Sequence, residues 1–538
     1  MMKALKWVGI VSGVLVALVI IALAGIYIYD PESRESWVKP GIAQEEIPAG
    51  VDKTVVFRNV TVIPMDSERI LEGQTVIIED QRITSIGTGG DIEIPTDAHV
   101  VDGTGRFLIP GLSDMITHLL GSENDLLVYL ANGVTTIRIM GNDPPMILEW
   151  RNQIRAGTRA GPNTWVWWPQ FENNDIDWEW GTERATRGGK TWVHTPAEAE
   201  RLVAEMAAMG VDGIKSHMVV SSEIYLALLE AAAKHGLPFD GHTPHDHIWC
   251  PSNPDCVFET GSDAWNDFRT MGASALTHVE ELVKMVELSD ESTHQASDES
   301  IRQMAQDAAD DGLWVTTTVH MFRSIADQAS DLEGTLAKMP EVKFVHPGVY
   351  GGQGWGPGAN DYVELGSQSW YPNYLAAQEK LLLALNESGA LLMSGTDTPV
   401  PGMVPGFSLH AELETMVDIG LPPYDVLRTS TYNPALYLGE LDEFGTVEAG
   451  KRADLVLLEE NPLEDISNTQ QIAGVMVRGR YYSRADLDLM LDAVAEDHGA
   501  AETTQSVMEI AFPIVLILLL AALVWFIVRR RKASQASS

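Results

Sequence analysis

The sequence predicts an α/β chain whose main domain is a (β/α)8 barrel, the TIM-barrel fold. Between residues 107 and 397, short apolar runs alternate with longer stretches of helical character, which is typical of parallel strands connected by helices. There are eight such runs, and eight strand–helix units close a barrel of this kind. Polar side chains follow several of the runs, at the strand ends where this fold places its functional site.

Each barrel strand is predicted from an apolar run, and each helix from apolar residues that recur at helical spacing. The predicted strands are Phe107–His118, Val134–Met140, Thr164–Gln170, Gly213–Met218, Leu237–His242, Ala275–Val279, Leu313–Val319 and Leu391–Asp397. The clearest predicted helices are Pro196–Met209, Ser221–His235, Asp298–Asp311 and Tyr374–Ser388. Residues 346–373 are rich in Gly, Trp and Tyr without helical periodicity, so we expect a long loop at the barrel mouth.

A small β-sandwich domain is predicted from the two flanks of the barrel. Short β-like runs separated by Asp, Gly and Pro turns precede the barrel, and similar runs return after it. We therefore expect residues 51–106 and 440–485 to build one sheet domain beside the barrel at 107–439. The β-like runs are 54–62, 74–78, 83–86, 452–459 and 472–482.

Both ends of the chain carry membrane signals. Residues 7–29 and 509–528 are predicted transmembrane helices, since each is an apolar run able to cross a hydrocarbon core of about 30 Å. Lysines precede the first run and the basic tail 529–538 follows the second, so the positive-inside rule places both termini in the cytoplasm. With linkers at 30–50 and 486–508, the body is expected on the extracytoplasmic side of the cell membrane, periplasmic or extracellular, tethered to the lipid bilayer.

Two further features of the sequence leave alternatives open. Ala22-Leu23-Ala24 resembles a small-residue cleavage site, so the first span is either a retained anchor or a cleaved signal peptide. Cys250 and Cys256 are the two cysteines of the chain, and outside the cytoplasm their spacing favours a loop-closing disulfide over two free thiols.

The charge of the chain narrows the class of partner. The formal net charge is −40 at pH 7, which repels the phosphates of nucleic acids. The sequence therefore argues against a nucleic-acid partner and favours a small-molecule substrate. It does not determine the oligomeric state.

Titratable side chains gather at the predicted strand ends. A single histidine at such a position is more often a hydrogen-bonded wall residue than a ligand. Three histidines, a lysine and an aspartate at the ends of strands that share one barrel have few structural reasons to coincide, which indicates a chemical site. The strand-end residues are His118, Arg138, Lys215, His217, His242, His278, His320 and Asp397.

These residues lie within motifs that resemble the amidohydrolase superfamily, nearest to its imidazolonepropionase-like and Xaa-Pro dipeptidase-like branch. The resemblance spans roughly residues 50–482, and its most specific motif is Gly445–Val456, which is similar to the family's return strand into the small β domain. The other motifs are Val101–Asp114, Gly133–Arg138, Gly395–Asp397 and Asn433–Ala435.

The resemblance implies a divalent metal centre, with zinc as the expected metal and one or two ions. The implied metal ligands are His118, Lys215, His242, His278 and Asp397. Lys215 corresponds to a lysine that is carboxylated in many members of the family and bridges two ions. Asp397 would accept a proton as metal-activated water attacks a carbonyl, and would return that proton to the leaving amine.

Two positions depart from the family pattern, one of which is Ile139, where the family often has an acidic residue after Arg138. The other departure affects the metal site. The first strand of the family carries His-x-His, and here Ile116 stands where the first histidine is expected. An isoleucine cannot bind metal, so the resemblance implies a single ion held by Lys215, His242 and His278. The residues that could instead restore a ligand or bind substrate are Arg138, His217, His245, His247 and His320.

Two functions of different classes are compatible with the sequence. The first is a metal-dependent amidohydrolase that cleaves the C–N bond of a small peptide-like or cyclic amide substrate, with dipeptides as the family analogy. The second is a catalytically inactive, membrane-anchored binding or sensing domain of the same fold. Retention of Lys215, His242, His278 and Asp397 together favours the enzyme.

Overall fold

The computed structural model describes residues 41–89, 92–119, 123–141, 146–173, 190–217, 219, 221–244, 262–290, 295–352, 355 and 360–499. Val38–Val494 form one compact unit, which contains the barrel and the small β domain. Both predicted transmembrane helices and the basic tail lie outside the described residues, as do Cys250, Cys256, His245 and His247. In the described part of the chain, no helix combines the length and the apolar character that a membrane crossing needs.

The main domain is built on a nine-stranded sheet in which all the pairings are parallel. Eight of its strands follow one another in the order β6-β7-β8-β10-β11-β12-β15-β16, as consecutive barrel strands do. The bounds are β6 Leu112–Thr117, β7 Val134–Met140, β8 Asn163–Glu172, β10 Gly213–Ser216, β11 Phe239–Gly241, β12 Ala275–Thr277, β15 Trp314–Thr316 and β16 Leu391–Met393, with β9 Lys190–Trp192 beside β8. The predicted eight-stranded barrel is therefore confirmed.

Backbone hydrogen bonds bring the last strand of the barrel back to the first. Met115 N donates to Ser394 O over 3.0 Å, and His118 N donates to Thr398 O over 2.7 Å. Asp397 N donates to Ile116 O over 2.9 Å. Because these bonds join β6 to the segment after β16, the sheet is nearly closed and its eight strand ends surround one space.

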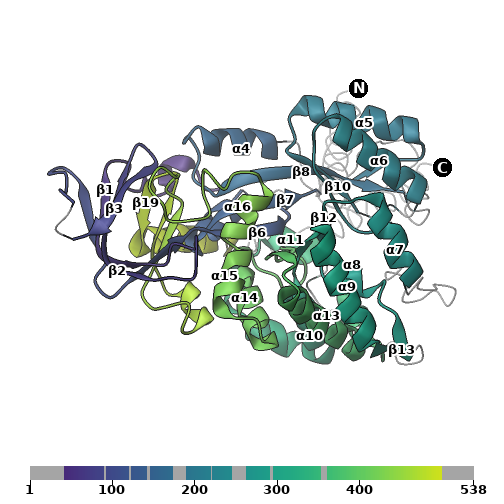
Figure 1. Ribbon diagram of the computed structural model, residues 1–538. Helices are drawn as coiled ribbons and strands as arrows, with labels where there is room; N and C mark the ends of the chain where they lie inside the picture. Colours follow the sequence, from purple (N-terminus) through teal and green to yellow (C-terminus); the bar gives the residue numbers. More distant parts are fainter. Residues whose placement is uncertain are drawn as a thin grey trace, which may run out of the picture. The chain divides into compact units, whose positions relative to one another are not determined.

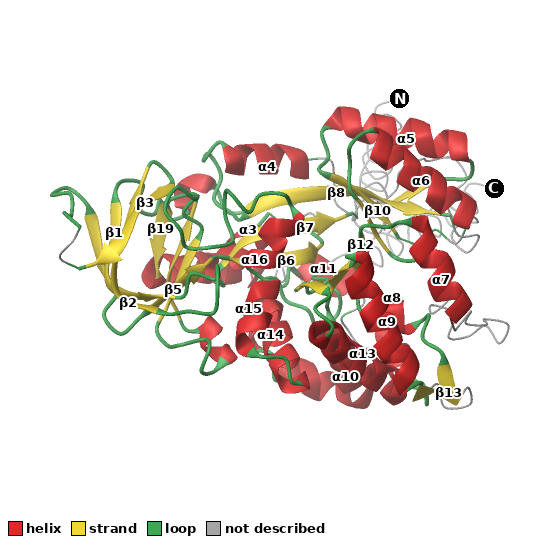
Figure 2. Cartoon of the chain, in the orientation of Figure 1, coloured by secondary structure: helices red, strands yellow, loops and turns green. Residues whose placement is uncertain are grey.

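Helices flank the barrel strands (Figure 2). The two predicted helices Pro196–Met209 and Asp298–Asp311 have the bounds expected from the sequence, each with an N-cap side chain that accepts a backbone hydrogen bond and a left-handed glycine at its end. The helices of the chain are α3 Asp125–Ala131, α4 Ile147–Arg155, α5 Pro196–Met209, α6 Ser222–Lys234, α7 Ser262–Met271, α8 Glu280–Val283, α9 Asp298–Asp311, α10 Val319–Ala337, α11 Pro347–Gly352, α12 Asp361–Gly366, α13 Tyr371–Glu387, α14 Phe407–Ile419, α15 Pro423–Thr429 and α16 Tyr432–Tyr437, with 3-10 turns η1 Gln44–Glu46, η3 Pro340–Phe344 and η4 Ile466–Gln470.

Two segments differ from the sequence prediction. The stretch 346–373, expected as a long loop, contains the short helices α11 and α12 and the start of α13, and Trp355 between them is fully buried. Short helices were not recognised because one or two turns are too few to establish a periodicity. The described part of the predicted linker 486–508 is helical as far as residue 499, and it buries Leu487 and Val494.

Strands from both flanks of the barrel form one sheet of eight strands, and not the two packed sheets of the predicted β-sandwich, because β17 of the second flank pairs directly with β5 of the first. Its path is β19-β18-β17-β5-β1-β2-β3, with β4 paired to β1. Figure 1 shows β1, β2, β3 and β19 of this sheet grouped together. A single apolar cluster contains residues from all eight strands, from Val55 near one end of the chain to Tyr481 near the other. The bounds are β1 Val55–Val62, β2 Leu71–Glu79, β3 Arg82–Thr88, β4 His99–Asp102, β5 Phe107–Pro110, β17 Leu455–Leu458, β18 Ile472–Val477 and β19 Arg480–Ser483; a separate hairpin pairs β13 Leu288–Asp290 with β14 Gln295–Ala296.

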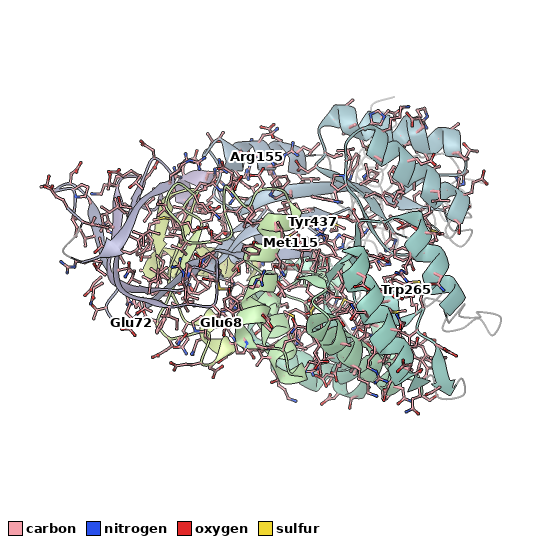
Figure 3. The ribbon with its side chains drawn as sticks, viewed as in Figure 1. Glu68, Glu72, Met115, Arg155, Trp265 and Tyr437 are labelled. Atoms are coloured by element: carbon pink, nitrogen blue, oxygen red, sulfur yellow. The ribbon has the colours of Figure 1, made fainter. Side chains whose placement is uncertain are left out.

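A buried ion pair crosses the interior of the barrel. Arg138 of β7 and Asp240 of β11 are both fully buried, and their Nη1 and Oδ2 atoms are 2.8 Å apart. The guanidinium also donates to Met115 O of β6 over 2.6 Å and to Thr316 Oγ1 of β15 over 3.0 Å. Tyr437 of α16 closes the arrangement, since its ring centroid lies 5.2 Å from the guanidinium carbon and its hydroxyl donates to Asp240. Figure 3 labels Tyr437 and Met115, the residue of β6 whose carbonyl oxygen accepts from Arg138.

Arg138→Met is expected to destabilise the barrel strongly, because it removes the cation and leaves the buried Asp240 carboxylate without its ion-pair partner. Loss of one member of a buried pair costs about 3–5 kcal/mol. The free energy of unfolding, measured by urea denaturation, tests this. Arg302→Met is the matched control, since Arg302 pairs with Glu299 at the surface, where a pair contributes about 0–1 kcal/mol. Equal losses in the two variants would contradict the prediction.

Candidate active site

The strand ends bring five predicted ligands to the same end of the barrel. Lys215 is the third residue of β10, and it is buried. His242 and His278 directly follow β11 and β12, and His118 directly follows β6. Asp397 lies four residues beyond the end of β16. These side chains are close enough for their charges to influence one another, since both His278 and Lys215 affect the pKa of Asp397.

His118 and Asp397 form a direct contact. His118 Nε2 lies 2.9 Å from Asp397 Oδ1, and the other ring nitrogen of His118 lies 3.1 Å from Gly141 O. The carbonyl oxygen can only accept, so the neutral ring carries its proton on Nδ1 or, when protonated, donates from both nitrogens. Burial by itself would raise the pKa of the Asp397 carboxyl, but the hydrogen bond from His118 and the nearby Lys215 outweigh it and hold that pKa well below its usual value. Asp397 is therefore an anion at neutral pH.

A buried carboxyl group fixes the turn that carries Asp397. Asp114 of β6 accepts hydrogen bonds from Thr396 N at 3.1 Å, from Thr396 Oγ1 at 2.6 Å and from Ile116 N at 3.3 Å. Tyr129 of α3 contacts Thr398 on the other side of the same turn. Asp397 itself has φ 57°, a left-handed conformation that a non-glycine residue adopts only where its surroundings enforce it. The Asp114 bonds supply that constraint.

Three imidazoles form a row along the ends of β10, β11 and β12. The ring centroids of His217 and His242 are 4.8 Å apart, and those of His242 and His278 are 5.1 Å apart. Each ring meets the next edge to face, with interplanar angles of 60° and 77°. His217 thus lies with the predicted ligands, whereas the sequence indicated only that it was a candidate.

Each imidazole of this row has an oxygen close to its Nδ1 atom. His217 Nδ1 lies 2.7 Å from Glu172 Oε1, and His242 Nδ1 lies 3.0 Å from Glu281 Oε1. His278 Nδ1 lies 2.8 Å from Thr318 Oγ1. Partners of this kind fix the ring orientation and the tautomer of histidines that bind metal ions.

The two carboxylates behind the imidazoles belong to different networks. Glu281, at the start of α8, also accepts hydrogen bonds from Thr243 N and Oγ1 at 2.9 and 2.8 Å and pairs with Lys284 over 2.5 Å. Burial opposes ionisation of Glu281, but Lys284 and His242 overcome it and lower the pKa of that carboxyl. Glu172, the last residue of β8, is fully buried beside His217.

The chemistry of these donors suits a divalent cation. Burial lowers the pKa of His278 to about 3, so its imidazole is neutral and keeps a lone pair at physiological pH. Asp397 is anionic, and oxygen and nitrogen donors of these types are the ones that zinc binds. Among the described residues, however, no group of three or more His, Cys, Asp and Glu side chains is already arranged to hold a metal ion.

Ile116 faces an apolar part of the barrel interior. It is fully buried and forms a hydrophobic cluster with Met140 of β7 and Trp167 of β8. A Cβ atom placed on Gly395 would lie 2.3 Å from Ile116 Cγ2, so the last strand packs tightly against it. The position of the missing histidine is therefore filled by close packing.

Two other predicted residues lie away from the imidazole row. Arg138 is held in the barrel interior by its ion pair with Asp240. His320 lies in the first turn of α10, where its Nδ1 is 3.1 Å from Thr415 Oγ1 of α14, and burial lowers its pKa to about 4. These contacts give both residues a structural role.

Sequence reasoning missed Glu172 and Glu281. The predicted third strand ended at Gln170, two residues short of Glu172, so this carboxylate was not recognised as a strand-end residue. A signal for Glu281 was present, because a glutamate three residues after a strand-end histidine can return toward the same pocket on the first helical turn.

Asp114→Asn is expected to reduce the pH dependence of stability. Burial raises the pKa of Asp114 to about 7, so the folded chain retains a proton that the unfolded chain releases. The contribution of Asp114 to the free energy of unfolding therefore falls as the pH rises from about 4 to 7, by up to roughly 1 kcal/mol per pH unit. Thermal unfolding between pH 4 and 8 measures this, with the exposed Asp52→Asn as the control for lost charge. Parallel pH profiles of the Asp114 variant and the wild type would contradict it.

Comparison with known proteins shows which family model and which proteins this chain resembles. Residues 376–481 match the model of the amidohydrolase family. A 64-residue segment, 12% of this chain, is 44% identical to the imidazolonepropionase of Vibrio cholerae serotype O1, of which it covers 15%.

Two solved structures show the fold over a greater length. A bottromycin amidohydrolase matches with a TM-score of 0.64 and 20% identity over 87% of this chain and 96% of its own. A Xaa-Pro dipeptidase with methionine bound in its active site matches with a TM-score of 0.60 and 18% identity, over 80% and 100% of the two chains. The chain thus contains an amidohydrolase family segment at residues 376–481 within a barrel fold shared with amidohydrolase structures.

Proposed function

We propose that this chain is a metal-dependent hydrolase that cleaves the C–N bond of a small peptide-like or cyclic amide substrate. The observation that carries the proposal is the placement of Asp397, 2.9 Å from His118, at the same strand ends as the adjacent imidazoles of His242 and His278. Its lowered pKa keeps the Asp397 carboxyl ionised, and burial lowers the pKa of His278 to about 3. An anionic proton acceptor beside neutral nitrogen donors is the combination that hydrolysis by an activated water requires. The family segment at 376–481 includes Asp397, which supports the assignment.

The residues that would hold the metal are Lys215, His242 and His278, with Asp397 and His118 beside them. When bound, a divalent ion such as zinc lowers the pKa of water and polarises a carbonyl group. Thr318 keeps His278 oriented through a hydrogen-bond contact of 2.8 Å, and Glu281 lies at ion-pair distance, 3.0 Å, from His242. Carboxylation of Lys215 is part of the proposal, because it would convert a buried amine into an oxygen ligand.

Asp397 is the proton carrier in this proposal. Its carboxylate is anionic, so it can accept a proton from the attacking water and transfer it to the departing amine. His118 donates a hydrogen bond to the carboxylate from Nε2 when protonated, which holds Asp397 in the orientation set by its turn. The side chains of His118 and Asp397 are only 9% and 13% exposed, which limits the access of bulk water to the proton transfer.

The proposed setting of the enzyme follows from the sequence. Transmembrane helices at 7–29 and 509–528 would anchor the barrel domain on the extracytoplasmic side of a cell membrane, with both termini in the cytoplasm. Dipeptides are the first substrates to test, since the structural neighbours include a Xaa-Pro dipeptidase.

A binding or sensing domain without catalysis is the second candidate. It is favoured by the close packing around Ile116 and by the lack of a preassembled three-ligand group among the described side chains. In that case the row of imidazoles would recognise a ligand without cleaving it.

Metal content per chain separates these candidates. The full-length wild type is expected to contain about one zinc ion per chain, and Ile116→His to approach two, because the substitution restores a ligand to the first strand. Inductively coupled plasma mass spectrometry measures this. Two ions in the wild type would contradict the single-ion centre. No ion, with no amidase activity after addition of zinc or manganese, would support the binding domain.

Asp397→Asn tests the proton carrier. With metal at saturating concentration, kcat for the dipeptides that the wild type cleaves is expected to fall by about 10²–10⁴-fold, the usual contribution of general acid–base catalysis. Asp52→Asn, an exposed carboxylate of the small β domain, serves as the control and should retain wild-type kcat. Unchanged kcat in a metal-loaded Asp397 variant would remove this residue from the mechanism.

A further inference from the structure

We propose that Glu412 of α14 is a positioning residue of the site, because its carboxylate caps the start of α10 and leaves the Thr318 hydroxyl to hold His278. Thr318 lies directly before α10 and contacts His278, so it connects the helix to the site. The inference rests on the proposed function, in which His278 is a site residue. It adds a residue that acts on His278 through Thr318.

Glu412 is buried where α14 packs against α10. It is 1% exposed, and its Oε1 accepts a hydrogen bond from Val319 N over 3.0 Å and its Oε2 one from His320 N over 2.6 Å. Burial raises the pKa of this carboxyl, and the backbone hydrogen bonds from His320 and Val319 oppose that rise. Thr415, almost one turn further along α14, has its Oγ1 atom 3.1 Å from His320 Nδ1. Two side chains of α14 therefore fix the first turn of α10.

The cap of α10 comes from another helix. A threonine directly before a helix normally accepts a hydrogen bond from the N–H group two or three residues further on. In α10, all of which the structure describes, the Thr318 side chain accepts no such bond. The N–H groups of Val319 and His320, the first two of the helix, donate to Glu412 instead. Glu412 thus replaces Thr318 as the cap, and a carboxylate at this end also suits the helix dipole.

The Thr318 hydroxyl is thereby free to contact the site. Its Oγ1 atom lies 2.8 Å from His278 Nδ1, and both residues are buried. Thr318 has φ 76° and His278 has φ 73°, so both adopt the left-handed conformation. A β-branched residue such as Thr318 is strained there, and it keeps this conformation only where its surroundings enforce it. The bonds from Glu412 to the two residues after Thr318 supply that constraint.

Labelling of the full-length, chelator-treated chain with diethyl pyrocarbonate tests the inference without reference to activity. The reagent acylates neutral imidazoles that it can reach, and mass spectrometry measures the rate at each histidine. His278 and His410 are a matched pair, since they are 3% and 2% exposed and burial lowers their pKa to about 3 and about 4. His410 lies two residues before Glu412 on α14, so its rate reports whether that helix has opened.

Glu412→Gln keeps the size of the side chain but places an amide donor against one of the two N–H groups. The labelling rate of His278 should rise about fivefold, the effect of one lost hydrogen bond on a local opening, while the rate of His410 stays unchanged. Glu414→Gln is the control substitution on the same helix, where Glu414 contacts Gln470 of η4, and it should leave both rates as in the wild type.

Substitutions of Thr318 test whether Glu412 acts through this residue. Thr318→Val removes the hydroxyl and should raise the labelling rate of His278 as Glu412→Gln does, whereas Thr318→Ser keeps the hydroxyl and the protection. Combining Glu412→Gln with Thr318→Val should label His278 no faster than either alone, because both remove the same restraint. For dipeptides that the wild type cleaves, Glu412→Gln should lower kcat by about 10–100-fold and leave KM unchanged, as loss of an outer partner of a metal-binding histidine does.

The outcomes separate this inference from the proposed function. An unchanged His278 rate in Glu412→Gln overturns the inference, and the metal content of the wild type still decides the proposed function. Equal rises at His278 and His410 would assign Glu412 to the fold alone, which also overturns the inference. If the wild type binds no metal, the proposed function fails while the labelling result stands. Should Glu412→Gln not fold, as judged by circular dichroism, the same labelling of Glu412→Asp decides, since it keeps the charge and withdraws it by one methylene group.

Discussion

The buried ion pair between Arg138 and Asp240 is the interaction on which the geometry of the barrel depends. Through Met115 O and Thr316 Oγ1, the guanidinium connects β6, β7, β11 and β15 across the interior. The site begins immediately above these anchors: His118 follows Met115 by three residues, His242 follows Asp240 by two, and Thr318 follows Thr316 by two. Anything that moves this pair therefore moves the side chains that we assign to catalysis.

At the strand ends above the Arg138–Asp240 ion pair, one side of the barrel interior is apolar and the other side is polar. Ile116, Met140 and Trp167 fill one side by close packing. On the other side, buried carboxylates lie against histidines. An ionised carboxylate away from water is stable only when it is paired, so each of these carboxylates holds a histidine close to it. Because of this division, the titratable side chains stay together on one side of the interior although Ile116 is apolar.

Most of the scaffold could be predicted from sequence, because it rests on short-range regularities. Helices α5 and α9 carry a capping side chain at the start and a glycine at the end, so their bounds were fixed locally. The short helices α11 and α12 and the helix that begins at residue 484 lack a long enough pattern. Glu172 was missed for a related reason, since a strand end is uncertain by a few residues and this residue lies two beyond the predicted end.

The sequence by itself determined the barrel, the contribution of both flanks to one β domain, and the position of five candidate site residues at the strand ends, because these follow from periodicity and motif order. Only the tertiary structure decided which of those residues act together. It placed Arg138 in a structural ion pair, His320 against α14, and His217 beside His242 with Glu172 behind it. Such partnerships join residues tens to hundreds of positions apart, and they depend on strand register and ring orientation, which no local pattern records.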